Sequence, residues 1–135
     1  MRLLVDTNIV LDLLLEREGL VDDALDAIKT AISNGDKLYL SSSAVTDIYY
    51  VIRKIKNSKE DALKGIARIV KVLHLAEVNE KCILAAMDSK MDDFEDAVVD
   101  AVAGNIKADY IITRNIKHFK NSQVKALTPI EFLKR

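Results

Sequence analysis

The residues of this chain that could do chemistry are mostly aspartates in otherwise apolar surroundings. The opening stretch MRLLVDTNIVLDLLLERE places Asp6 directly after an apolar run, and Asp12 follows among leucines. Ligands of parallel α/β sheets bind outside the carboxyl ends of the strands, so Asp6 is expected at a ligand-binding edge. The alternative is that Asp6 only caps the next helix, because Asp is a favoured N-cap residue. Asp12 is expected to be a structural or supporting residue.

A second aspartate follows the next strand-like run, in the stretch SSSAVTDIYYVI. Asp47 falls about one turn into the predicted helix and has apolar residues on both sides in the sequence. A carboxylate near apolar neighbours needs a partner, which favours a functional site. The alternative is that Asp47 lies on the solvent-facing side of an amphipathic helix.

The stretch MDDFEDAVVDAVAGNIKADYIITRN predicts a buried helix that carries acids on one face. Asp93, Asp96 and Asp100 recur at helical spacing and fall within an arc of about 60°. Several like charges on a buried face repel one another and require a counter-charge, for which a bound cation is the simplest source. An N-cap role for Asp93 and a first-turn position for Asp96 would explain two of the three without a metal.

The polar residues that follow the strands point to one edge of the sheet. The third strand-like run, DYIIT, leads into Thr113, Arg114 and Asn115. Thr7 and Asn8 are short and polar, and so are suited to hydrogen-bond a neighbouring carboxylate. Acids and amides from three separate strand ends are therefore expected to lie close together.

The cations nearest to this edge in the sequence are Arg114, Lys117 and His118. Arg114 and Lys117 are candidates for contacts with phosphate groups, and ordinary surface charge is the alternative. His118 is expected at the rim of the site as a structural residue, and a role as a ligand of metal or substrate is the alternative.

These residues require strands and helices that alternate along the chain, and the sequence predicts them. Apolar runs without alternation are typical of strands that are covered on both faces of a parallel sheet. The expected architecture is a three-layer α/β/α sandwich with a central, mainly parallel sheet of four to five strands. The predicted strands are 3–5, 37–40 and 109–112, with further short ones near 75 and 124. The predicted helices are 21–33, 42 or 43 to 52, 58–72, 79–90, 92 or 93 to 106, and one that opens at TPIE.

Composition limits the class of protein. The 135 residues are 50% hydrophobic and 30% charged with a net charge of −1, and they predict a single domain over 1–135. Cys82 is the one cysteine, so a disulfide framework and a thiolate metal site are excluded. Asp6 and Asp12 interrupt the only candidate signal sequence, and no run is long enough to span a membrane. A cytoplasmic protein is expected.

The motifs resemble those of the PIN domain, a nuclease family with a four-acid pocket that binds metal. VDTNIVLD is similar to its opening motif, and SSSAVTDIYYVIRK to the segment that carries its second acid, which is usually Glu. DFEDAVVDAVAGNIKADYIITRNIKHF is similar to the segment with the third acid and the closing polar motif. The resemblance is to small prokaryotic stand-alone members, which include the VapC-type toxins.

Carried over by position, the resemblance implies that Asp6, Asp47 and Asp96 are the catalytic metal ligands. Thr7 and Asn8 match residues that brace the site, and Thr113 is assigned to the same group. Asn115 stands where many relatives have Asp, which leaves the fourth ligand open. The further candidate metal ligands are Asp93, Asp100 and Asn115.

The implied function is a ribonuclease that hydrolyses phosphodiester bonds with Mg²⁺ or Mn²⁺, since oxygen ligands suit these ions. The resemblance also implies a homodimer and leaves open a pairing with an antitoxin protein. The alternative is a catalytically weak or inactive PIN fold that binds RNA or protein, which Asn115 and the short side chain of Asp47 favour. An aspartyl phosphotransferase fits less well, because Asn8 stands where that pattern needs a second Asp.

Overall fold

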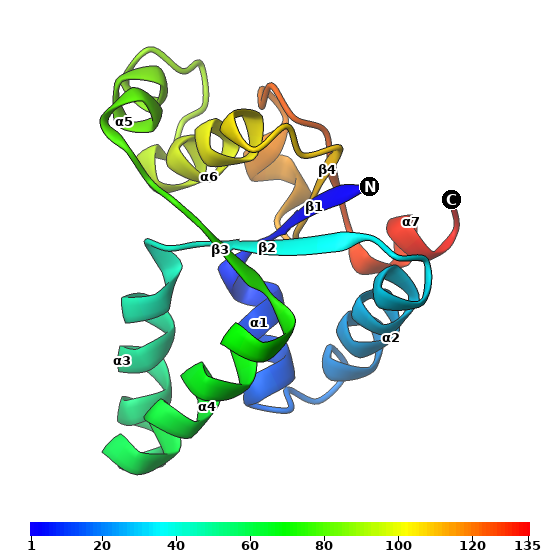
Figure 1. Cartoon of the computed structure of the whole chain (residues 1–135), viewed down its shortest axis with the longest axis vertical. Helices are drawn as coiled ribbons and strands as arrows, with labels where there is room; N and C mark the ends of the chain where they lie inside the picture. Colours follow the sequence, from blue (N-terminus) through cyan, green and yellow to red (C-terminus); the bar gives the residue numbers. More distant parts are fainter.

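A five-stranded parallel sheet forms the centre of the computed structural model, which describes residues 1–135 (Figure 1). Its strands lie in the order β3-β2-β1-β4-β5, and every neighbouring pair is parallel. The predicted sheet of four to five strands, in a three-layer arrangement, is thereby confirmed. The strands are β1 (Arg2–Val5), β2 (Lys37–Ser41), β3 (His74–Ala76), β4 (Tyr110–Ile112) and β5 (Ala126–Leu127).

Two layers of helices cover the two faces of the sheet (Figure 1). Helices α1 to α4 and α7 pack on one face, and α5 and α6 pack on the other. The helices are α1 (Thr7–Leu14), α2 (Val21–Ser33), α3 (Ala44–Lys56), α4 (Lys59–Val72), α5 (Glu80–Met87), α6 (Phe94–Asn105) and α7 (Pro129–Leu133), with a 3₁₀ helix η1 (Ile116–Phe119).

Strand β1 is the middle of the sheet and is apolar because both of its faces are covered. Leu3 and Val5 belong to the core beneath α1 to α4, and Leu4 belongs to the core beneath α5 and α6. None of these three side chains is more than 1% exposed. Packing on both sides thus fixes the ends of β1 and its neighbour β4. The residues directly after these strands are therefore held in place as well.

Most predicted helix starts are present and are held by the expected side chains. Ser58, Asn79, Asp93 and Thr128 each accept a hydrogen bond from a backbone N–H in the first turn of the following helix. The capping box around Thr128 is complete, since Glu131 also accepts from the Thr128 N–H.

Five details differ from the expectations. Helix α3 continues four residues beyond Ile52 to Lys56, and α5 ends at Met87 rather than near Lys90. Ser43 precedes α3, but its hydroxyl pairs with the Ser41 hydroxyl and does not cap the helix. The short strand expected near 124 lies at Ala126–Leu127, and η1 was not predicted. None of the helices has both the length and the apolar character needed to cross a membrane.

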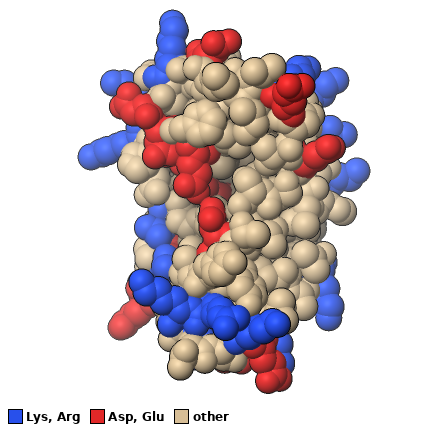
Figure 2. Space-filling model, turned by 90° about the vertical axis from the view of Figure 1, so that its left-hand side faces the viewer, with Lys and Arg blue, Asp and Glu red and all other residues tan.

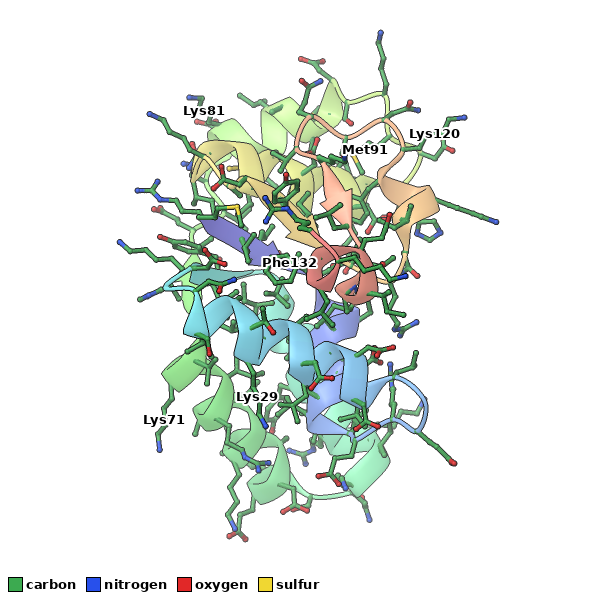
Figure 3. All side chains as sticks on the ribbon, turned by 90° about the vertical axis from the view of Figure 1, so that its right-hand side faces the viewer. Lys29, Lys71, Lys81, Met91, Lys120 and Phe132 are labelled. Atoms are coloured by element: carbon green, nitrogen blue, oxygen red, sulfur yellow. The ribbon has the colours of Figure 1, made fainter.

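Helix α7 closes the core by placing Phe132 against the α2 side of the molecule (Figure 3). It has only five residues, so its start depends on the Thr128 cap. We expect Thr128→Ala to lower the free energy of unfolding by about 1 kcal/mol, measured by urea denaturation. Ser33→Ala, at an exposed hydroxyl in the last turn of α2, should change it by less than about 0.5 kcal/mol. Equal effects of the two substitutions would contradict the role of the cap.

Candidate functional site

A cleft of about 290 Å³ opens where β1 and β4 end, at the edge of the sheet that the sequence predicts. Residues from the starts of α1 and α6, the α1–α2 turn and η1 surround it. The lining residues are Asp6, Thr7, Asn8, Leu11, Arg17, Asp93, Glu95, Asp96, Asn115 and His118. Asp6 and Asp96, predicted from separate segments, therefore face a common space.

Asp6 is the most constrained acid of the cleft. It is 7% exposed, and its Oδ2 accepts hydrogen bonds from Thr113 Oγ1 at 2.8 Å and Asn8 Nδ2 at 3.1 Å. Its Oδ1 accepts from the N–H of Thr7 at 2.9 Å, so Asp6 also caps α1. Burial raises the pKa of Asp6 above its usual value, and the hydrogen bond from Thr113 opposes that rise. The helix-cap and cleft-facing interpretations of Asp6 are therefore both correct.

Thr113 joins the end of β4 to the start of α1. Its fully buried hydroxyl donates to Asp6 and accepts from Asn8 Nδ2 at 3.2 Å and from the N–H of Asn115 at 3.0 Å. The Oδ1 of Asn8 accepts from the N–H of Arg114 at 3.2 Å. These contacts give Asp6 a single orientation, because each hydrogen bond fixes the position of another.

The first turn of α6 supplies most of the negative charge. Asp93, Glu95 and Asp96 all line the cleft, and Asp93 Oδ1 accepts from the N–H of Asp96 at 2.9 Å. Burial, followed by the charges of Asp6 and Asp93, raises the pKa of Asp96. Burial, followed by the charge of Asp47, raises the pKa of Glu95. The acids therefore repel one another, as a site for a cation requires.

Glu95 was missed by the sequence reasoning, which followed only the acids at helical spacing. A signal was present, because Glu95 directly precedes Asp96 and shares the first helical turn with it. Glu95 and Asp96 are adjacent at the start of α6, and both line the cleft because α6 begins beside it.

Asp47 lies in the first turn of α3 and is exposed. It does not line the cleft, but its charge raises the pKa of Glu95, which places it beside the acidic group. On the face formed by α3, α5 and α6, acidic side chains form a line, and a band of Lys and Arg lies toward one end of the molecule (Figure 2). Asp47 is therefore exposed to solvent, as the alternative interpretation expects. It also lies near Glu95 and adds its charge to that of the cleft acids.

The residues around η1 divide between the cleft and the solvent. Asn115 lines the cleft, and His118 Nδ1 lies 3.2 Å from Asp96 Oδ2. The His118 side chain is 59% exposed, in agreement with a rim position. Lys117 is exposed and does not line the cleft.

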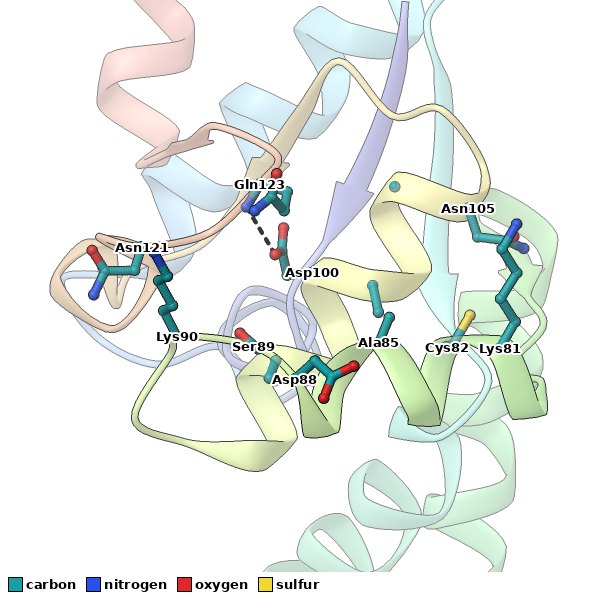
Figure 4. A pocket seen from close by; sticks show the side chains of 13 residues that line it. Lys81, Cys82, Ala85, Asp88, Ser89, Lys90, Asp100, Asn105, Asn121 and Gln123 are labelled. Carbon is teal, nitrogen blue, oxygen red and sulfur yellow. Dashed lines mark hydrogen bonds between the residues drawn. The ribbon is translucent and has the colours of Figure 1, made fainter.

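Asp100 is a correction to the predicted metal-ligand candidates. Its carboxylate is buried and accepts backbone hydrogen bonds from Gln123 at 2.8 Å and Val124 at 2.9 Å. It faces a different cavity of about 590 Å³ between α5, α6 and the segment 121–123 (Figure 4). One further turn moves a residue about 5.4 Å along the helix, so sharing a helix face with Asp96 does not bring Asp100 to the same cleft.

Arg114 also differs from its expected place. Its guanidinium donates to the buried carboxylate of Asp12, from Nε to Oδ2 at 2.6 Å and from Nη2 to Oδ1 at 3.2 Å. Arg114 does not line the Asp6 cleft, whereas Arg17 does and also contacts Asp12. The prediction that Asp12 is structural agrees with these contacts.

The donors of the cleft have the chemistry that a hard divalent cation requires. Carboxylate, amide and hydroxyl oxygens line it, and no thiol does. No three acidic, histidine or cysteine side chains lie close enough together to hold an ion as they stand. Glu95 is exposed and its side chain makes no hydrogen bond within the protein, so it is free to turn toward an ion beside the fixed carboxylate of Asp6, whereas Asp93 is held as the N-cap of α6. The residues fit a metal by type, with Asp6 as the rigid member.

Asp96 and Asp100 lie one turn apart on α6 and should respond to neutralisation in opposite ways. A carboxyl group with a raised folded-state pKa contributes stability below its unfolded pKa and loses it as pH rises, so charged Asp96 opposes folding at pH 7. Asp96→Asn should therefore stabilise the metal-free protein by about 0.5–1 kcal/mol. Asp100→Asn should destabilise it by about 1.5–3 kcal/mol, because the two backbone donors lose a charged acceptor.

Urea denaturation at pH 7 in the presence of a chelator measures both effects. The gain from Asp96→Asn should shrink as pH is lowered through the raised pKa of Asp96, because the wild-type carboxyl then becomes protonated. A loss of stability from Asp96→Asn equal to that from Asp100→Asn would contradict the electrostatic description of the cleft.

Comparisons with known proteins find relatives that span nearly the whole chain. The chain is 30% identical over 139 residues to Ribonuclease VapC1 of Aquifex aeolicus (strain VF5), covering 99% of this chain and 94% of that protein. Among solved structures, VapBC2 from Rickettsia felis, bound to a DNA fragment from its promoter, has a TM-score of 0.77 at 18% identity, covering 95% of this chain and 98% of that chain.

VapC20 from Mycobacterium tuberculosis, described as a sarcin-ricin loop cleaving toxin, has a TM-score of 0.62 at 14% identity. The similarity covers 81% of this chain and 86% of that chain. At these identities the solved structures establish the shared fold alone. The PIN domain family itself matches residues 2–117, which is most of the sequence and includes every residue of the cleft except His118. The chain belongs to the PIN domain family.

Proposed function

We propose that this protein is a metal-dependent ribonuclease of the toxin type. The observation that carries the proposal is the buried Asp6 carboxylate, held by Thr113 and Asn8 and facing the acids of α6 across one cleft. Membership of the PIN family and similarity to a protein named Ribonuclease VapC1 support hydrolysis of RNA as the reaction.

Asp6 and Asp96 would hold Mg²⁺ or Mn²⁺, and Asp47, Asp93, Glu95 and Asn115 are the residues available to complete its coordination. A divalent cation in such a site polarises the scissile phosphate and lowers the pKa of the attacking water. Glu95, which the sequence did not predict, lines the cleft beside Asp96.

The residues of the chain orient the Asp6 carboxylate and supply acceptors for a proton of the attacking water. Thr113 and Asn8 fix Asp6, which limits the reorganisation needed when the site is filled. Glu95 and Asp96 face the cleft with raised pKa values and are placed to accept a hydrogen bond from the attacking water. His118 contacts one oxygen of the Asp96 carboxylate and so limits its orientations.

The alternative function is a PIN fold that binds RNA or protein without cleaving it. Its support is Asn115 in the cleft, at a position where the resemblance implies an acid in many relatives. The absence of three closely grouped ligands in the present arrangement also favours it. A protein of this kind would take up metal no better than a variant without Asp6.

The relatives point to a protein partner, and the exposed apolar surface points to a second copy of this chain. The R. felis structure is a VapBC2 complex bound to DNA, and a Klebsiella pneumoniae neighbour is described as a toxin-antitoxin complex. We therefore propose an antitoxin protein as a partner of this chain, and a cytoplasmic location for the pair. We also propose that the protein is a homodimer, because α3, α5 and α6 expose large apolar side chains. These are Tyr50 (66% exposed), Leu84 (54%), Met87 (67%) and Phe94 (53%).

The nuclease proposal is tested by cleavage of labelled single-stranded RNA, structured RNA and DNA with Mn²⁺. Asp6→Asn and Asp96→Asn should each lower the rate of RNA cleavage at least about 100-fold, because each removes a charged ligand. Asp47→Asn should also lower it, and Asp26→Asn on the exposed surface of α2 is the matched control, with the wild-type rate. Full activity of Asp96→Asn would contradict the proposed site.

The homodimer is tested by light scattering on the purified protein at micromolar concentration. We expect a mass of twice 15.1 kDa, and Met87→Glu should shift it toward the monomer by placing a charge on the exposed apolar face. A monomeric mass of the wild type would rule out the dimer at this concentration and would leave the nuclease proposal intact.

A further inference from the structure

Asp12 is a buried acid between two arginines. Its side chain is 1% exposed, and it accepts from Arg114 at 2.6 and 3.2 Å and from Arg17 Nη1 at 3.3 Å. One carboxylate therefore holds two guanidinium groups, and the group of three carries a net charge of +1. Each arginine side chain remains about one-third exposed, at 32% for Arg114 and 35% for Arg17.

The two arginines face different spaces. Arg114 lines a separate cavity of about 270 Å³ together with Leu20, Thr128 and Pro129. Arg17 lines the Asp6 cleft, and it is the only Lys or Arg that does so. The positive charge that the sequence led us to seek in Arg114 and Lys117 is thus supplied to this cleft by the turn after α1.

Arg17 is fixed at both its backbone and its side chain by the same residue. Its N–H donates to the backbone oxygen of Asp12 at 3.1 Å, while its Nη1 donates to the Asp12 carboxylate. The preceding residue, Glu16, has a positive φ of 48°, which turns the chain back over the end of α1. A guanidinium held in this way loses little conformational entropy when it binds a ligand.

Arg17 does not neutralise the acids of the cleft. It forms no ion pair with Asp6, Asp93, Glu95 or Asp96, and Asp12 is its only ion-pair partner. Its Nε and Nη2 donate no hydrogen bond within the protein. Two donors of a planar, oriented guanidinium are therefore free beside a group of acids that repels any anion.

These observations point to an anionic ligand that enters an acidic cleft. A guanidinium matches the oxygens of a phosphate in a bidentate manner, and phosphate contacts position a nucleic acid in its binding site. We propose that Arg17 binds a backbone phosphate of the RNA and so holds the strand against the cleft. This inference rests on the proposed function and assigns to it a residue that touches the substrate without contacting the metal.

The test compares RNA binding by the wild type, Arg17→Gln, Arg17→Lys and the control Lys29→Gln. Lys29 lies on the exposed face of α2, makes no ion pair and undergoes the same change in charge (Figure 3). The probe is a fluorescein-labelled single-stranded RNA of about 12 nucleotides. Its anisotropy is measured with Ca²⁺ between about 50 and 200 mM KCl, and a gel confirms that it stays intact.

Arg17→Gln should weaken binding about tenfold at the lowest salt, because a charged hydrogen-bond donor is lost. It should also reduce the slope of log affinity against log salt by about 0.7, the value for one contact to a single strand. Arg17→Lys should keep the slope, because the positive charge remains. It should lose only part of the affinity, because lysine lacks the planar guanidinium that binds a phosphate in a bidentate manner. Mn²⁺ binding by calorimetry should be retained in all four proteins, because Arg17 is not a metal ligand.

The outcomes separate this inference from the proposed function. Wild-type affinity and slope in Arg17→Gln would overturn the role of Arg17 and leave the nuclease proposal standing. A wild type that neither binds nor cleaves RNA would overturn both. A reduced slope in Arg17→Lys, or an equal loss in Lys29→Gln, would show that the salt dependence does not arise from a phosphate at Arg17. Thermal melting confirms that each variant is folded, which we expect because Arg114 still pairs with Asp12.

Discussion

The structure depends on one buried polar contact, the hydrogen bond from Thr113 to Asp6 where β4 and β1 end side by side. A carboxylate that is 7% exposed is costly unless it is hydrogen-bonded, and three donors from the next turn and the neighbouring strand satisfy it. The apolar residues of β1 can lead into an acid only because this arrangement exists. The hydrogen bonds that offset the cost of burying the Asp6 carboxylate also hold it so that it faces the cleft.

Charge in this protein is arranged at the expense of stability. Asp6, Glu95 and Asp96 are held close enough that burial and mutual repulsion raise the pKa values of Glu95 and Asp96, and burial alone raises that of Asp6. Asp100 and Asp12 show the opposite use of a buried acid, since backbone donors satisfy the first and arginines the second. Asp12 and Asp100 stabilise the fold through their partners, and the acids with raised pKa values mark the site.

The sequence predicted the sheet, its helices and the pair Asp6 and Asp96, because strand-to-helix transitions and caps are local signals. It misplaced Asp100 because the angular position of a residue on a helix does not give its position along the helix axis. It misplaced Arg114 because the sequence does not show which acid a long side chain will reach. It overlooked Glu95, whose direction depends on how the chain enters α6. It also overlooked Arg17, although a buried Asp12 among leucines requires a cation, and Arg17 lies five residues away.

The central claim is that the acids at this sheet edge form a binding site for a divalent cation, with Asp6 as its fixed ligand. Calorimetric titration of the protein with Mn²⁺ tests it most directly, with Asp6→Asn as the comparison and unfolding curves to show that both are folded. We expect saturable binding by the wild type and a loss of at least about tenfold in affinity in Asp6→Asn, as for the removal of a charged ligand. Equal Mn²⁺ affinity in the two proteins, or no uptake by either, would contradict the account.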